Sequence, residues 1–116
     1  PGPGHKNAPK TKKEKGLKSM LKNFRTYHLA IDLYRSCQVV KPNGPGADQF
    51  ERALLSIPLN LAEGSAKPTV KDRKKFYFIA LGSLREVQAM LHLFGTPELV
   101  TQADILAAHI YRLGHG

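Results

Sequence analysis

The chain contains no tryptophan, a single cysteine and no long apolar run, and each shortage excludes a class of protein. Cys37 has no second cysteine to pair with inside the chain, which fits a reducing compartment. The longest apolar run, 76–81, is much shorter than the roughly 18 residues of a transmembrane helix, so no membrane association is expected. The basic N-terminus is followed by no apolar stretch, so we expect no signal peptide and predict a cytoplasmic location.

Motifs for enzymatic chemistry are also missing. No acidic residue has a histidine three positions later, as a di-iron site in a helical bundle requires. The chain has neither C-x-x-C nor H-E-x-x-H, and Gly64-Ser65 lacks the rest of a G-x-S-x-G elbow. No sequence motif activates Cys37 as a nucleophile. We therefore expect a protein that is not an enzyme, with no catalytic residue, no metal and no cofactor.

Acidic residues are scarce, with 9 against 18 lysines and arginines, which gives a net charge of +9 in 116 residues. This balance favours anionic partners. The length fits one small domain, near the size at which assembly with further copies helps stability.

The basic residues are concentrated at the start of the chain. Residues 1–19 hold six lysines, three prolines and three glycines against one glutamate, so we expect a flexible tail ahead of a domain spanning 20–116. Two interpretations of this tail stay open. It is either a leader that is not native, with Met20 as the natural start, or a native basic arm that binds nucleic acid.

Apolar residues at helical spacing predict four helices, over 21–40, from about 48 to 63, from the cap Thr69 to 94, and from Pro97 onward. Asp48 is expected to cap the second helix. The expected buried positions are Phe24, Tyr27, His28, Ile31, Tyr34 and Gln38, flanked by Leu21, Leu29 and Leu33; then Phe50, Ala53, Leu54, Ile57 and Leu61; then Phe76, Ala80, Ser83, Val87, Met90 and Phe94, with Leu84 and Leu91 beside them; and finally Leu99, Ala103, Leu106, Ile110 and Leu113. Short connections make an all-α, antiparallel up-and-down four-helix bundle the predicted fold.

Pro58 lies inside the second predicted helix and Gly82 inside the third. Pro58 lacks an N–H and leaves the carbonyl of Leu54 without its helical partner, and we expect Asn60 to donate to that carbonyl. Gly64 is expected to end its helix in the left-handed conformation. Gly82 lies inside the third helix at a cost of about 1 kcal/mol, which suggests that another helix passes close to it.

A polar stripe accompanies these positions and consists of Ser56, Asn60, Glu63, Ser83 and Glu86. One interpretation is structural: satisfied contacts at a helix kink or a subunit interface, with Glu63 paired to Arg52 or Arg85. The other interpretation is a ligand site.

A basic cluster lies at the start of the third helix and consists of Lys67, Lys71, Arg73, Lys74 and Lys75. A helix N-terminus already carries partial positive charge, so cations are unfavourable there unless an anion offsets them. The cluster is either a solvated surface or a contact for a phosphate backbone, with affinity that is independent of sequence and sensitive to salt. Basic and aromatic residues do not alternate along the chain, so base-specific recognition is not predicted.

Segments 56–64 (SIPLNLAEG) and 76–86 (FYFIALGSLRE) resemble the bacterial four-helix-bundle family encoded in 23S rRNA intervening sequences. Its relatives include the accessory variability determinant proteins of diversity-generating retroelements. The resemblance implies a homopentameric barrel in which Ser56, Pro58, Asn60, Glu63, Gly64, Gly82, Ser83 and Glu86 fix packing or subunit contacts. In the retroelement relatives such a barrel is basic and associates with a reverse transcriptase and nucleic acid.

Two functions follow as hypotheses. The first is a non-enzymatic oligomer that binds RNA or DNA through phosphate contacts, as an accessory to a reverse transcriptase or to rRNA. The second is a protein-binding scaffold on which the basic cluster is incidental. The first predicts nucleic-acid affinity that falls steeply with added salt.

Overall fold

A computed structural model describes residues 11–40 and 42–116, and this part of the chain contains five helices joined by turns, and no strand. The helices are α2 (Lys12–Lys22), α3 (Arg25–Cys37), α4 (Ala47–Ser65), α5 (Val70–Phe94) and α6 (Pro97–His115). The predicted all-α class is confirmed. The prediction of a flexible tail falls partly on residues 1–10, which lie outside the described residues.

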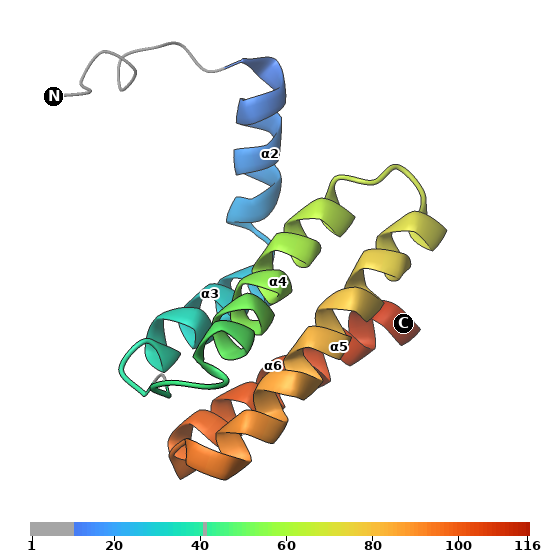
Figure 1. The fold of residues 1–116 in the computed structure, drawn as a ribbon. Coiled ribbons are helices and arrows are strands. Elements are labelled where there is room, and N and C mark those ends of the chain that lie inside the picture. The colour runs from blue at the N-terminus through green and yellow to red at the C-terminus, as the bar shows by residue number, and fades with distance from the viewer. Residues whose placement is uncertain (1–10, 41) are drawn as a thin grey trace, which may run out of the picture.

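Helices α3 to α6 form the body of the fold and alternate in direction (Figure 1). α4 packs along α5 and α5 along α6, while the shorter α3 lies against both α4 and α6. The core between them is made mainly of leucine, isoleucine and alanine around one fully buried phenylalanine, Phe50. None of the helices in the described ranges is long and apolar enough to cross a lipid bilayer.

Most of the first predicted helix, 21–40, is α3, and its first two residues belong to the separate helix α2. α2 ends at Lys22, and the chain bends at 23–24, where the N–H of Phe24 donates to the carbonyl of Leu21 over 3.1 Å. The ring Nε2–H of His28 donates to the carbonyl of Lys22 over 2.9 Å and holds the bend. α2 projects away from the bundle (Figure 1), and the predicted domain boundary at residue 19 lies inside it.

The buried face of α3 differs from the prediction. Its buried residues are Thr26, Ala30, Leu33 and Cys37, whereas the aromatic side of the helix is only half-buried. Small side chains allow α3 to approach α4 and α6 closely, and the larger aromatic rings occupy the flanks of the contact. Burial raises the pKa of the Cys37 thiol to about 11, so this residue is an uncharged core side chain at neutral pH.

Helix α4 contains the predicted apolar stripe, and all five residues of 50–61 expected in it are buried. Its start was predicted wrongly: Gly46 is the N-cap, with φ of +94°, and Asp48 lies in the first turn without capping. Its end was also predicted wrongly. α4 continues through Gly64 to Ser65, and Ala66 follows in a right-handed conformation with φ of −86°.

Helices α5 and α6 begin as predicted. The hydroxyl oxygen Oγ1 of Thr69 accepts from the N–H of Asp72 over 3.1 Å, and Oγ1 of Thr96 accepts from the N–H of Leu99 over 3.3 Å. The buried residues of α5 are Tyr77, Ala80, Leu84, Val87 and Leu91, so the core stripe is rotated from the predicted one. The rotation follows from packing on two neighbours, since α5 lies between α4 and α6 and buries the face midway between them. The predicted stripe of α6 is buried from Leu99 to Ile110.

Candidate nucleic-acid interface

The basic cluster lies around the turn from α4 to α5, and two of its five members are engaged within the protein. Lys67 Nζ lies 2.9 Å from Glu63 Oε2 and 5.1 Å from the ring centre of Phe76. Arg73 donates from Nη1 to the carbonyl of Lys67 over 3.0 Å. These contacts stabilise the turn, so Lys67 and Arg73 are poorly placed to give their full charge to a phosphate.

The other three members, Lys71, Lys74 and Lys75, form a small cationic surface on α5, which we call the lysine face. Lys71 and Lys75 are exposed and Lys74 is half-buried. Their spacing of three and four residues places them on one side of the helix. Within the described part of the chain, these three lysines have no ion-pair partner. The lysine face is therefore available to an external anion.

The polar stripe is a row of hydrogen bonds that joins α4 to α5. Ser83 Oγ donates to Ser56 Oγ over 2.7 Å, and the Asn60 side-chain amide donates to the same oxygen over 2.9 Å. Farther along, Gln49 Nε2 donates to Glu86 Oε2 over 2.6 Å. These contacts fix the register of the two helices.

Two predicted pairings in this row are wrong. The amide of Asn60 donates to the carbonyl of Ser56 over 2.8 Å, two residues after Leu54, whose carbonyl Pro58 was expected to release. Glu63 pairs with Lys67, four residues later in the turn that follows α4, in place of Arg52 or Arg85. A side chain four residues away in the chain is a nearer partner than a cation across the bundle.

The two glycines have different environments from those predicted. A Cβ on Gly82 would meet nothing within 4 Å, so no other helix in the described ranges passes close to it. A Cβ on Gly64 would lie 2.9 Å from Cε1 of Tyr77 and 3.1 Å from the carbonyl oxygen of Arg73. Gly64 is therefore the position where the backbones of α4 and α5 approach.

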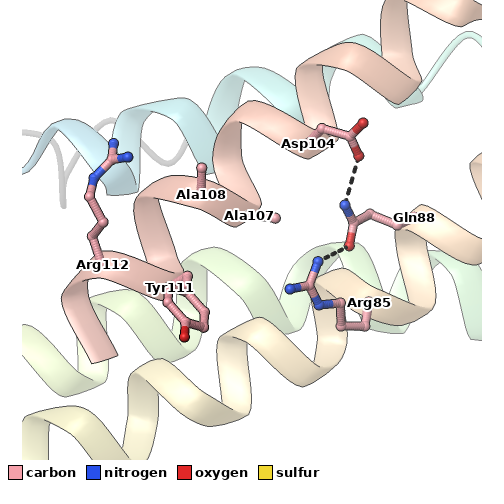
Figure 2. Close-up of a pocket in the computed structure, with 7 residues that line it drawn as sticks. All are labelled: Arg85, Gln88, Asp104, Ala107, Ala108, Tyr111 and Arg112. Carbon is pink, nitrogen blue, oxygen red and sulfur yellow. Dashed lines mark hydrogen bonds between the residues drawn. The ribbon is translucent and has the colours of Figure 1, made fainter. Parts of the chain in front are cut away.

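A second surface feature, which was not predicted from the sequence, lies between α5 and α6. It is an open hollow of about 420 Å³ lined by Arg85, Gln88, Asp104, Ala107, Ala108, Tyr111 and Arg112 (Figure 2). Arg85 donates to Gln88 Oε1 and Gln88 donates to Asp104 Oδ1, each over 2.8 Å. The signal in the sequence was an arginine on α5 and a tyrosine on α6, but only the packing of the two helices brings them together.

Further ionisable side chains lie near α6 outside this hollow. His109 is half-buried, and its pKa is lowered by burial and by the nearby guanidinium groups of Arg112 and Arg25. Arg25 is the first residue of α3, so this group connects α6 to the neighbouring helix. No group of three or more His, Cys, Asp or Glu side chains in the described ranges is arranged to hold a metal ion.

Comparison with models of known protein families finds a match. A family model described as 23S rRNA-intervening sequence protein matches residues 22–112, from the last residue of α2 through most of α6. Searches of curated proteins and of solved structures give no match. The matched range contains both segments on which the resemblance rests and covers most of the chain. The chain therefore belongs to the 23S rRNA-intervening sequence protein family.

Proposed function

We propose that this protein is a small, non-enzymatic helical bundle that assembles with copies of itself and binds nucleic acid through phosphate contacts. The observation that carries the proposal is the lysine face: Lys71, Lys74 and Lys75 lie on one side of α5 near its positive end, without an ion-pair partner in the described chain. Such an arrangement is unfavourable by itself and becomes favourable when an anion binds. The name of the family refers to 23S rRNA, so RNA is the first nucleic acid to test.

Binding should be sensitive to salt, because the contacts neutralise phosphates and release counterions. Three phosphate contacts predict that the affinity falls about 20-fold for a single strand and about 40-fold for duplex DNA between about 50 and 200 mM salt. We expect the variant with Lys71, Lys74 and Lys75 changed to glutamate to lose this binding. Fluorescence anisotropy of labelled RNA and duplex DNA at both salt concentrations measures the effect.

The matched control changes the three exposed lysines of α2, Lys12, Lys18 and Lys22, to glutamate. Both triple variants alter the net charge equally, so a general electrostatic effect would weaken both to the same extent. If only the α2 variant lost binding, the assignment to α5 would be wrong and the basic N-terminal region would be the contact.

Self-assembly is supported by apolar side chains that the bundle leaves uncovered. Leu55 and Leu59 on α4 and Ile79 on α5 are exposed, Leu59 by 64%. They lie along the outer surfaces of the two helices that the polar stripe joins. A second copy covering them would bury apolar area, which stabilises an assembly of small domains. The pentameric number rests on the family resemblance alone.

Light scattering tests the assembly. We expect a mass that is a multiple of 12.8 kDa, and we expect Leu59→Asp together with Ile79→Asp to reduce it to one protomer. Leu93→Asp is the control, since Leu93 is exposed by 84% on another part of α5. A wild-type protein that stays monomeric at micromolar concentration would contradict the proposal.

The alternative, a protein-binding scaffold, is favoured by the same exposed leucines and isoleucine. The scaffold function would replace nucleic-acid binding as the proposal if the wild-type protein bound neither RNA nor DNA in the anisotropy experiment. The family match carries no link to retroelements, so association with a reverse transcriptase remains a prediction from the resemblance.

A further inference from the structure

Three aromatic rings meet on the surface between α5 and α6, and we call them the aromatic cluster: Phe78, Tyr111 and His115. The rings of Tyr111 and His115 are stacked, with centres 3.8 Å apart and planes 13° apart. The ring of Phe78 meets His115 edge-on, with centres 5.2 Å apart. Phe78 is 47% exposed and Tyr111 is 50% exposed, so the protein leaves large parts of these rings in water.

Local contacts hold the cluster in place. His115 donates from Nδ1 to the carbonyl of Tyr111 over 2.9 Å, which fixes its ring against the tyrosine. A Cβ on Gly114 would lie 3.2 Å from Cε1 of Phe78, so the phenylalanine rests directly on the backbone of α6. The stacked pair is therefore ordered before any ligand arrives, which lowers the entropy cost of binding to it.

Cations lie on both sides of the aromatic cluster along α5. Lys71, Lys74 and Lys75 precede Phe78 by seven, four and three residues, and Arg85 follows it by seven. These spacings place all of them on the same side of α5 as Phe78. The distance from Lys71 to Arg85 along the helix is about 21 Å, because each residue rises about 1.5 Å.

The hollow continues this surface beyond Tyr111. Figure 2 shows the ring of Tyr111 projecting from α6 toward α5, and the side chain of Arg85 extending from α5 toward this ring. Ala107 and Ala108, whose side chains are short, also line the hollow. A volume of about 420 Å³ lies within the usual range for small-molecule sites. The hollow is therefore large enough to hold a flat ring of nucleobase size next to Tyr111.

We propose that the aromatic cluster stacks unpaired bases of a single-stranded nucleic acid, while the lysine face and Arg85 contact its phosphates. This inference rests on the proposed nucleic-acid function and adds the class of ligand. Base faces are covered in a duplex and uncovered in a single strand, so rings flanked by cations favour the single strand. Stacking on a ring accepts any base, which fits a surface that offers few directed hydrogen-bond donors.

The test compares two labelled oligonucleotides of equal length, one normal and one abasic at its central positions. Both carry the same phosphates, so their difference in affinity reports contacts to bases. We expect the wild-type protein to bind the normal strand about tenfold more tightly or better, since a stacked base contributes this much. We expect Tyr111→Leu and Phe78→Leu each to remove most of that difference and to leave the salt dependence unchanged.

Tyr27→Leu on α3 is the matched control, because it removes a half-buried tyrosine outside the cluster. Thermal unfolding of each variant shows that the bundle is retained. If the wild-type protein bound the abasic strand as tightly as the normal one, or if Tyr111→Leu behaved as Tyr27→Leu, stacking would be overturned while phosphate binding stood.

Two further outcomes are distinct from these. An absence of salt-sensitive binding to any strand would overturn the proposed function together with this inference. Binding to anionic phospholipid vesicles that Phe78→Leu abolishes, with unchanged affinity for the oligonucleotides, would assign the cluster to a membrane surface and overturn base stacking.

Discussion

Phe50→Ala is expected to destabilise the bundle by about 3–5 kcal/mol, the usual cost of removing a buried phenylalanine. Phe50 is fully buried, and its ring meets Phe94 edge-on with centres 5.0 Å apart. This pair joins the beginning of α4 to the end of α5, where the two helices close one end of the bundle. The alanine variant would leave a cavity and remove the aromatic contact together.

Chemical denaturation measures the free energy of unfolding of both proteins, at one salt and one protein concentration because assembly would add to stability. Leu93→Ala serves as the control, since Leu93 is almost fully exposed and its replacement should change stability by less than about 0.5 kcal/mol. A cost for Phe50→Ala no larger than that of the control would contradict the described packing of α4 on α5.

Gly64→Ala is expected to destabilise the protein by about 1–3 kcal/mol, although alanine is ordinarily the better helix former by about 1 kcal/mol. The added methyl would lie 2.9 Å from Cε1 of Tyr77, 3.0 Å from Cβ of Phe76 and 3.1 Å from the carbonyl oxygen of Arg73. Tyr77 is buried and the carbonyl belongs to the backbone of α5, so neither can move aside freely. The helices would have to separate at this point.

Gly82→Ala is the matched control for this substitution. Gly82 also lies inside a helix, but a Cβ there meets nothing within 4 Å, so the variant should gain up to about 1 kcal/mol from helix propensity. The two free energies of unfolding should therefore shift in opposite directions. Equal shifts would show that α4 and α5 are not in close contact at Gly64.

Patterns within one helix were sufficient to predict most of the fold. The stripe from Phe50 to Leu61, the cap Thr69 and the start of the last helix at Pro97 agree with the structure, because they depend on local spacing and local hydrogen bonds. The buried face of α3 was not predictable in the same way. The pattern favoured its aromatic residues, whereas the packing between two neighbours selected the side with Ala30 and Cys37.

The candidate site shows the same limit. The basic cluster was visible as a run of cations, but the engagement of Lys67 and Arg73 depends on how the turn folds back on α4. The glycine with a close neighbour is Gly64 and not Gly82, because the distance between two helices is a property of their packing. The aromatic cluster was missed for a related reason, since Phe78 lies 33 residues before Tyr111 in the sequence and joins it only across α5 and α6.

On α5, Phe78 packs toward α6 and shares its side of the helix with Lys71, Lys74 and Arg85, whereas Leu55 and Leu59 are exposed on α4. If copies assemble through the α4 side, each copy still presents its cationic surface, and one strand can contact several copies in succession. The second and later contacts then occur at a high effective concentration, so the avidity of the assembly exceeds the affinity of one protomer. A substitution at Leu59 that separates the copies would weaken binding to a long strand far more than to a short one, without removing a single cation.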